Sequence, residues 1–335
     1  MILISALSLS SRRNQGWKSG LGPGLDEAAF VYTATGGFRS CEIAQSPDSM
    51  ISVLQLRTID YAAGIRLQQK LVQLRKDGLV GDVLLLLEHA PVITLGRNAK
   101  ASNVLASRER LAECGVEIFE CDRGGDVTFH GPGQIVGYPI FDLRGYTRGT
   151  ADAPSTLRKT LGAVDFIRRL EEVLMRSCAD FAIPTKRQQG LTGVWTDAVT
   201  TQSDVGIAAS AVPQSEASKS GSATEAKLAA IGVHISRFVT SHGFALNVNT
   251  DLSYFDMIVP CGITSKPVTS MQRELGREVD LNAVGESISR NFGVVFQSQM
   301  LWMDTLDSLL GRTVGVPVQA PEELRQLRND DTYRA

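Results

Sequence analysis

Hydrophobic residues recur along parts of this chain at the spacing of one helix face, and these parts are predicted to be helices. Leu67, Leu71 and Leu74 follow this spacing, so we predict a helix from Tyr61 to Lys76. The same reasoning predicts helices at Arg108 to Glu113, at Asp165 to Cys178, after the N-cap residue Asp280, and around Leu301 to Leu310.

Other stretches carry the patterns of β-strands. Residues 82–88 form an almost continuous apolar run, as expected of a central strand that is buried on both faces. Residues 233–235 and 244–248 alternate between apolar and other side chains, which predicts two neighbouring strands with a turn at 241–243. Further strands are predicted at 92–97, 116–120, 138–142 and 193–196. Strands and helices interleave without a regular strand–helix–strand repeat, so we predict an α+β fold instead of a doubly wound sheet.

Changes in composition divide the chain. The first 25 residues hold three basic and no acidic residues, which is typical of a mitochondrial transit peptide; a disordered tail and a cytoplasmic protein are the alternative. Residues 199–223 are rich in Ser, Ala, Thr and Gln and lack aromatic residues, so they are predicted to be a flexible insertion. We therefore expect an N-terminal extension at 1–50, one domain at 51–310, and a polar tail at 311–335.

Charge and cysteine content exclude several classes of protein. A formal net charge of −2 over 335 residues gives no sign of a nucleic-acid partner. The longest clear apolar run, Val83 to Leu87, is far shorter than the roughly 18–20 residues of a membrane span. The five cysteines are odd in number and lack a Cys-x-x-Cys pair, so neither a disulfide framework nor a zinc site is predicted. Cys114, Cys121 and Cys178 are expected to be small buried side chains.

Two side chains suited to nucleophilic catalysis stand out in the predicted sheet. Cys261 follows Val259-Pro260, a stiff bend, and precedes Gly262, so its thiol is expected on a constrained turn. Lys227 lies at the start of the strand that contains residues 233–235. An ammonium group close to a thiol favours the thiolate, so the two residues fit an activated Cys–Lys pair. Taken singly, Cys261 also fits a buried thiol and Lys227 a solvated lysine.

The densest glycine cluster of the chain runs from Arg123 to Gln134. Glycines allow the backbone to approach a ligand closely, and consecutive amides can form an anion-binding concavity. The cluster has neither the phosphate-binding-loop pattern nor the dinucleotide-binding pattern. With Arg123 and His130 flanking it, we predict the edge of a pocket, and an ordinary tight turn is the alternative. His234 and His242 lack the spacing of metal ligands, so no metal site is predicted.

Five blocks of sequence occur in one order along the chain. They are Glu88 to Arg97 (EHAPVITLGR), Arg123 to Gln134 (RGGDVTFHGPGQ), Lys227 to Gly232 (KLAAIG), Thr240 to Val248 (TSHGFALNV) and Pro260 to Gly262 (PCG). Jointly they closely resemble the lipoyl(octanoyl) transferase family, and the resemblance covers Ser52 to Asn291.

The resemblance implies an α+β fold of the biotin/lipoate protein ligase type, a mixed sheet flanked by helices. It also implies that Cys261 is the acyl-thioester nucleophile and that Lys227 tunes it. The residues implied to line the acyl site are Arg123, Gly124, Gly125, Asp126, Val127, Thr128, Phe129, His130, Ala230, Ile231, Gly232, Gly243, Phe244 and Ala245. Three positions depart from the family pattern, Ala90 for a second proline, His234 for arginine and Phe238 for tryptophan, and they affect the expected pocket wall.

The implied reaction is the transfer of an octanoyl group from octanoyl-acyl carrier protein to a lysine of lipoyl domains. The implied acceptors are the 2-oxoacid dehydrogenase complexes and the glycine cleavage H protein, and a monomer without cofactor, metal, nucleic-acid or membrane partner is expected. We expect Phe129, Ile231 and Phe244 to line a tunnel for the eight-carbon chain. Two rival functions remain, an ATP-dependent lipoate- or biotin-protein ligase, which needs no nucleophilic thiol at Cys261, and a scaffold that binds carrier or lipoyl domains without turnover.

Overall fold

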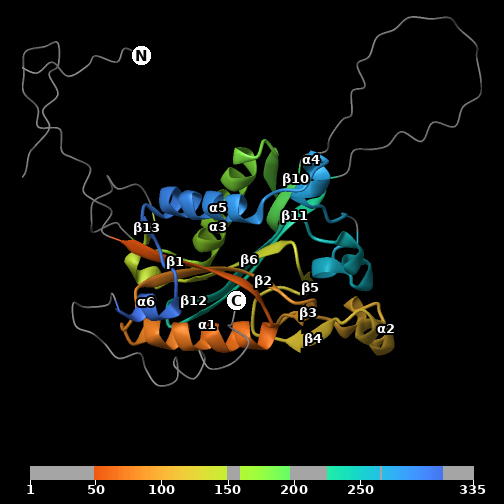
Figure 1. The fold of residues 1–335 in the computed structure, drawn as a ribbon, viewed down its shortest axis with the longest axis horizontal. Coiled ribbons are helices and arrows are strands. Elements are labelled where there is room, and N and C mark those ends of the chain that lie inside the picture. The colour runs from red at the N-terminus through yellow and green to blue at the C-terminus, as the bar shows by residue number, and fades with distance from the viewer. Residues whose placement is uncertain (1–48, 149–158, 197–224, 265, 312–335) are drawn as a thin grey trace, which may run out of the picture. The chain divides into compact units, whose positions relative to one another are not determined.

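The computed structural model of the chain describes residues 49–148, 159–196, 225–264 and 266–311. The predicted N-terminal extension, insertion and tail fall almost wholly outside the described residues, so these three segments stay predictions. The domain described here is built on one large sheet, with helices on both of its faces (Figure 1).

The large sheet has eight strands in the order β13-β1-β2-β6-β12-β11-β10-β9. Its strands are β1 (Met50–Ile59), β2 (Asp82–His89), β6 (Gln134–Ile140), β9 (Thr185–Gln188), β10 (Leu191–Thr196), β11 (Lys227–Ser236), β12 (Val239–Asn247) and β13 (Gln299–Trp302). β1 runs parallel to β2 and β13, whereas the other neighbours are antiparallel. The sheet is therefore mixed, and the predicted α+β class is confirmed.

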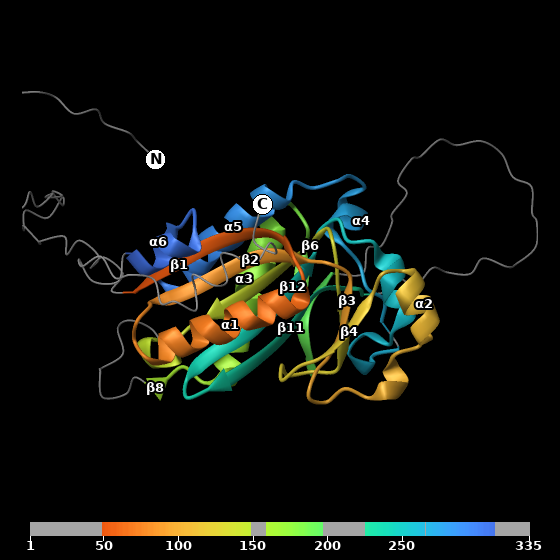
Figure 2. The ribbon, with the colours of Figure 1, turned by 60° about the horizontal axis from the view of Figure 1, so that its bottom comes forward.

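Helices cover the two faces of this sheet. α1 (Tyr61–Lys76) lies on one face, and α3 (Ala163–Asp180) and α5 (Leu281–Phe296) lie together on the other (Figure 2). The central strand β2 serves both layers, because Leu84 and Leu86 join the core beneath α3 and α5 while its alternate residues join the core beneath α1. The continuous apolar run at 82–88 reflects this double burial, as predicted.

A second, three-stranded sheet lies beside the large one and carries part of the predicted pocket. It consists of β3 (Val92–Leu95), β4 (Glu117–Glu120) and β5 (Val127–His130), in the order β4-β3-β5. The remaining helices and strands are α2 (Arg108–Glu113), β7 (Thr147–Arg148), β8 (Lys159–Thr160), α4 (Met271–Leu275) and α6 (Leu306–Gly311). The glycine-rich stretch leads directly into this sheet, because it contains β5, which pairs antiparallel with β3.

Most predicted helices are confirmed, and one is partly wrong. α1 and α2 have the predicted bounds, and Asp280 caps α5 by accepting the backbone N–H of Asn282 at 2.9 Å. The helix predicted around 301–310 is reduced to α6, because Leu301 belongs to β13, the edge strand that pairs with β1.

The turn predicted at 241–243 is wrong. Those residues lie inside β12, and the turn between β11 and β12 is formed by Arg237 and Phe238, with φ of 51° and 69°. Ser236 and Val239 pair directly, so the loop has two residues, and left-handed backbone at both of them suits the twist of such a hairpin. His242 keeps its place in the strand at φ 55°, with its N–H donated to Oε1 of Gln68 at 2.8 Å.

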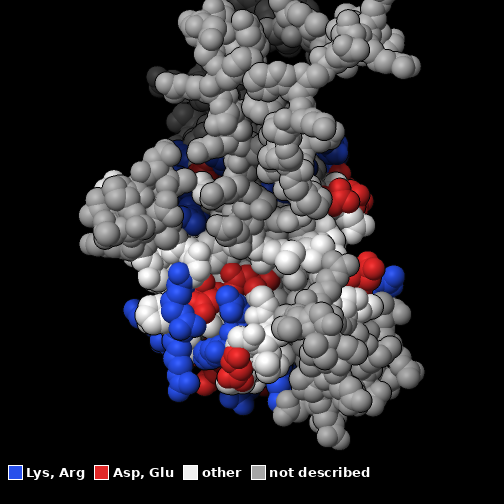
Figure 3. All heavy atoms as spheres, turned by 90° about the vertical axis from the view of Figure 1, so that its left-hand side faces the viewer, with Lys and Arg blue, Asp and Glu red and all other residues white. Residues whose placement is uncertain are grey.

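The surface carries both signs of charge. On the side of the domain shown in Figure 3, basic and acidic side chains lie next to one another. Within the described residues, no helix combines the length and the apolar character needed to cross a lipid bilayer.

Candidate active site

The Cys261 thiol lies on a short helical turn, Pro260–Gly262, that follows the extended residue Val259. Cys261 has a left-handed backbone, with φ 56° and ψ 20°, a conformation that costs a non-glycine residue free energy and that folds retain mostly at functional sites. The sequence predicted a thiol on a constrained turn, and the structure places it on one.

The Cys261 turn is held in place by Asp126 and Asn103. The side-chain amide of Asn103 donates to Oδ2 of Asp126 at 2.6 Å, and the backbone carbonyl of Asn103 accepts the N–H of Val259 at 2.7 Å. A Cβ on Gly262 would lie only 2.8 Å from the same Asp126 oxygen, so the carboxylate packs directly against the turn. Asp126 therefore positions the turn that carries Cys261.

The Lys227 ammonium lies beside this thiol. Lys227 is the first residue of β11 and is buried, and its Nζ donates to Sγ of Cys261 at 3.1 Å. Nζ also lies 5.2 Å from the ring centroid of Trp195 on the adjacent strand. A Cβ at Gly193, where φ is 128°, would come within 2.9 Å of Cε of Lys227, so only glycine leaves room for the lysine stem.

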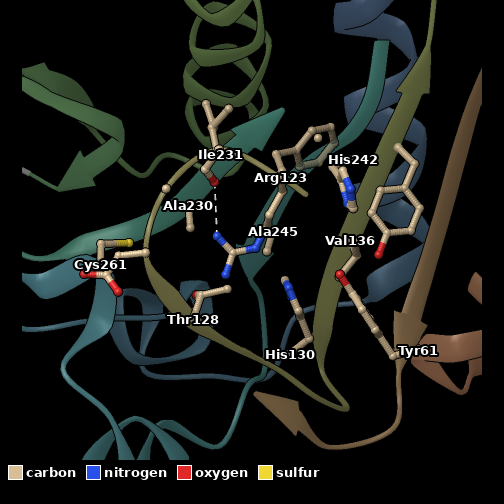
Figure 4. A pocket seen from close by; sticks show the side chains of 17 residues that line it. Tyr61, Arg123, Thr128, His130, Val136, Ala230, Ile231, His242, Ala245 and Cys261 are labelled. Carbon is tan, nitrogen blue, oxygen red and sulfur yellow. Dashed lines mark hydrogen bonds between the residues drawn. The ribbon is translucent and has the colours of Figure 1, made fainter. Parts of the chain in front are cut away.

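Two cavities meet at Cys261. The larger has an empty volume of about 470 Å³ and the smaller about 280 Å³, both including space that is open to solvent. Lys227 lines the smaller cavity, and Cys261 lines both. In Figure 4, Cys261 lies at one end of the larger cavity, Ala230 and Thr128 are the labelled residues near it, and His242 and Tyr61 lie toward the other end. A group attached to the sulfur of Cys261 can thus extend into the larger cavity, while the amine of Lys227 lies in the smaller one.

Most of the predicted binding residues line the larger cavity. These are Arg123, Gly124, Gly125, Asp126, Thr128, His130, Ala230, Ile231, Gly232, Gly243, Phe244 and Ala245. Val127 and Phe129 do not, because side chains alternate along β5 and these two point into a separate apolar core, where Phe129 stacks on Tyr254 at 4.6 Å. The prediction that Phe129 lines an acyl tunnel is therefore wrong.

Four further residues line the larger cavity and were not predicted: Tyr61, Val136, Tyr138 and His242. Tyr61 begins α1, and the two β6 residues read as ordinary strand positions, so nothing in their local sequence marks them as pocket residues. His242 was assigned to a turn. Its position in β12, directly before the pocket residues of the same strand, is the signal that would have placed it.

The other three cysteines that the structure describes are not part of this site. Cys178 is buried as predicted, and burial raises the pKa of its thiol to about 12, which keeps it unreactive. Cys114 and Cys121 are only partly buried, so the expectation that all three are core side chains is wrong for these two. Among the described residues, no group of His, Cys, Asp or Glu side chains is arranged to hold a metal ion.

Buried, uncharged histidines lie at and next to the larger cavity. Burial lowers the pKa of His130 to about 3 and that of His89 to about 4. Nδ1 of His130 lies 2.8 Å from Oε1 of Gln134, whose amide donates to Asn247 and to the carbonyl of Phe129, so Nδ1 carries the proton. Nε2 of His89 lies 2.6 Å from the hydroxyl of Tyr138. The cavity therefore combines neutral polar groups with apolar walls.

These two histidines predict a loss of stability in weak acid. Both are neutral when folded, whereas in the unfolded chain they protonate below about pH 6.5, so unfolding takes up protons as the pH falls. The free energy of unfolding should fall by about 2 kcal/mol for each histidine between about pH 7.5 and about pH 5. Urea unfolding across this range measures it. A stability that does not change would show that His89 and His130 are charged or exposed in the folded protein.

Arg123 is a buried cation in the cavity wall. Its Nε and one terminal nitrogen donate to the hydroxyl of Thr94 at 3.1 and 2.8 Å, and the same terminal nitrogen donates to the Thr94 carbonyl at 2.7 Å. The other terminal nitrogen donates to the carbonyl of Gly124 at 3.1 Å (Figure 4). These bonds fix the glycine-rich loop against β3. The glycine-rich stretch therefore forms the predicted edge of a pocket and is not an ordinary tight turn.

His234 and His242 share one carboxylate at the edge of the larger cavity. Asp122 lies 2.5 Å from Nδ1 of His234 and 2.7 Å from Nε2 of His242. Partial burial works against ionisation of Asp122, but the hydrogen bond from His242 and the two histidines outweigh it and lower its pKa. Burial lowers the pKa of His242 as well. His234, one of the three departures from the family pattern, thus pairs with the carboxylate that also holds His242, a residue of the cavity wall.

Comparison with known proteins gives the family. Residues 60–293 match the model of the lipoyl protein ligase A/B catalytic domain. The octanoyltransferase of Koribacter versatilis is 54% identical over 284 residues, which cover 85% of this chain and 99% of that protein. The octanoyltransferase of Acidobacterium capsulatum is 51% identical over 263 residues, or 78% and 96% of the two chains. These relatives are bacterial, so they give the predicted mitochondrial location no support.

Solved structures share the fold at low sequence identity. The bipartite lipoate protein ligase of Thermoplasma acidophilum superposes with a TM-score of 0.54 at 13% identity, covering 85% of this chain and 92% of that one. The predicted fold of the lipoate protein ligase type is confirmed by this likeness. Taken with the domain match and the two bacterial relatives, the chain belongs to the octanoyltransferase family, the acyltransferases that transfer an octanoyl group in protein lipoylation.

Proposed function

We propose that this enzyme takes the octanoyl group from the thioester of an acyl carrier protein and passes it to a lysine of a lipoyl domain, by way of an octanoyl-Cys261 thioester. The observation that carries the proposal is the 3.1 Å contact between Nζ of Lys227 and Sγ of Cys261 at the meeting point of two cavities. An ammonium next to a thiol favours the thiolate by electrostatic attraction, and the thiolate is the nucleophile.

In the first half-reaction the Cys261 thiolate attacks the carbonyl carbon of the incoming thioester. A carbon–sulfur bond forms to Cys261, and the bond to the carrier sulfur then breaks. The Lys227 ammonium gives its proton to the departing thiolate, so the carrier leaves as a thiol and Lys227 becomes a neutral amine.

In the second half-reaction the amine of the acceptor lysine attacks the octanoyl-Cys261 carbonyl. Lys227, now neutral, accepts the proton that this amine loses as the amide bond forms. The Cys261 thiolate leaves and is again paired with the Lys227 ammonium, which restores the starting state. One lysine thus serves both half-reactions.

The octanoyl chain is proposed to occupy the larger cavity. Ile231, Phe244, Val136 and Ala245 supply apolar wall along it, and each methylene removed from water contributes about 0.8 kcal/mol to binding. An acyl chain that is too short forgoes part of this free energy. The enzyme should therefore prefer medium-length chains over acetyl or butyryl groups.

The acyl group arrives activated as a thioester, so the proposed reaction needs neither ATP nor a cofactor. The proposed partners are octanoyl-acyl carrier protein as donor and, as acceptors, the lipoyl domains of 2-oxoacid dehydrogenase complexes and the glycine cleavage H protein. The enzyme is proposed to act as a monomer.

A transfer assay separates this function from its rivals. Purified enzyme is mixed with apo lipoyl domain in two ways. The first mixture contains octanoyl-acyl carrier protein without ATP, and the second contains free octanoate with ATP and Mg²⁺. The mass of the lipoyl domain is then measured by mass spectrometry. Octanoylation in the first mixture only is the expected result. Product in the second mixture only would identify an ATP-dependent ligase, and product in neither would identify a scaffold without turnover.

A further inference from the structure

The passage between the two cavities is lined by four residues. Thr128, Ala230, Ala245 and Cys261 are the described residues that line both the larger and the smaller cavity. A carbonyl carbon bonded to Sγ of Cys261 must lie at this passage, with its acyl chain on one side and the departing or attacking group on the other. Since the two alanines carry only methyl groups, Thr128 is the wall residue whose side chain can donate a hydrogen bond there.

The side chain of Thr128 is mostly buried, and its hydroxyl has no protein partner among the described residues. The residue is 7% exposed. Thr94, which pairs with Thr128 across β3 and β5, shows the contrast, because its hydroxyl is held by Arg123. Because Thr128 lines both cavities, its hydroxyl is free to donate to a group that is bound at the passage between them.

We propose that the Thr128 hydroxyl donates a hydrogen bond to the oxyanion that forms when Cys261 is acylated and deacylated. The proposal rests on the acyl-Cys261 route above. As Sγ bonds to the carbonyl carbon, the electron pair of the C=O bond moves onto the oxygen. Thr128 keeps its proton and stabilises the negative charge until the carbonyl reforms and the leaving group departs.

The position of Thr128 suits this role better than that of its neighbours. It precedes His130 by two residues on the same face of β5, and Figure 4 shows it between Cys261 and His130. Lys227 lies on the side of the smaller cavity, where it exchanges protons with the sulfur and the amine. Thr128 and Lys227 thus have separate tasks, one on the carbonyl oxygen and one on the transferred proton.

Thr128→Val, which exchanges a hydroxyl for a methyl of similar shape, tests the proposal. Single-turnover acylation by octanoyl-acyl carrier protein is followed by intact mass, and alkylation of Cys261 by iodoacetamide is followed in parallel. Loss of an oxyanion donor should slow acylation about 100-fold, with the KM for the carrier changed little. Alkylation should stay within about twofold of wild type, because displacement at saturated carbon forms no oxyanion. Thr128→Ser should restore acylation to within about fivefold.

Three outcomes would overturn the role. They are acylation of Thr128→Val at the wild-type rate, acylation of Thr128→Ser as slow as that of Thr128→Val, and a joint fall of acylation and alkylation. The last would mean that the side chain only positions Cys261. Thr128→Ala replaces the valine variant if that one does not fold. Wild-type enzyme that forms no acyl-Cys261 at all would refute the acyl-enzyme route itself, a failure that the wild-type arm distinguishes from failure of the Thr128 assignment.

Discussion

Cys261→Ser is expected to form no octanoyl adduct and to lose octanoyl transfer by at least about 1,000-fold, since removing a nucleophile leaves only binding and electrostatic contributions to catalysis. In the wild type, Nζ of Lys227 lies 3.1 Å from Sγ of Cys261. A serine hydroxyl at the same turn stays protonated beside this ammonium, so it does not replace the thiolate as nucleophile. Intact mass after incubation with octanoyl-acyl carrier protein, and transfer to apo lipoyl domain, measure the two effects.

Cys114→Ser is the matched control for this experiment. Cys114 is also a partly buried free thiol, but it packs in the small core beside the three-stranded sheet and lines neither cavity. It should retain the adduct and the transfer rate. An adduct of full yield on Cys261→Ser would refute the nucleophile assignment, and an adduct lost in Cys114→Ser would move it to the other thiol.

Lys227→Met is expected to lower octanoyl transfer by about 1,000-fold, because it removes the proton donor and acceptor of both half-reactions. Methionine preserves an unbranched stem against Trp195 and Gly193 while it deletes the charge. Without the ammonium the thiolate loses its ion-pair partner, so alkylation of Cys261 by iodoacetamide at neutral pH should also slow by about tenfold or more. The steady-state rate of octanoyl transfer and the rate of Cys261 alkylation, followed by mass spectrometry, measure these two effects.

Lys266→Met separates the contact with sulfur from a general effect of positive charge. Nζ of Lys266 lies over the same indole, 5.8 Å from its centroid, but it pairs with Glu225 and does not line either cavity. Its transfer and alkylation rates should stay within about threefold of wild type. If Lys227→Met alkylates as fast as wild type, Lys227 plays no part in activating the thiol.

Local sequence predicted the chemistry of this site better than its shape. Pro260 and Gly262 around Cys261 specify a turn, and Lys227 opens a strand of clear alternation, so both residues could be singled out. Their contact could not be derived from local patterns, because they lie 34 positions apart in the sequence and the turn between β11 and β12 comes between them. The sequence blocks of the family supplied the pairing that local patterns lack.

The errors have local physical causes. Val127 and Phe129 were expected in the pocket because the family resemblance implied the whole glycine-rich stretch from Arg123 to His130. It becomes a strand at Val127, so alternate side chains leave the cavity. The hairpin turn was assigned to a Ser-His-Gly sequence, although Arg237 and Phe238, neither of which favours left-handed backbone, adopt it. Here the pairing of the flanking strands overrides the preference of the turn residues.

Isolation and chase of the acyl-enzyme tests the central claim most directly. Enzyme acylated by octanoyl-acyl carrier protein without ATP is freed of donor and digested to locate the octanoyl group, and a second portion is mixed with apo lipoyl domain. The account predicts octanoyl on Cys261 alone, and its stoichiometric passage to a lysine of the lipoyl domain at a rate no slower than steady-state turnover. An octanoyl group on another residue, or one on Cys261 that the acceptor cannot remove, would contradict it.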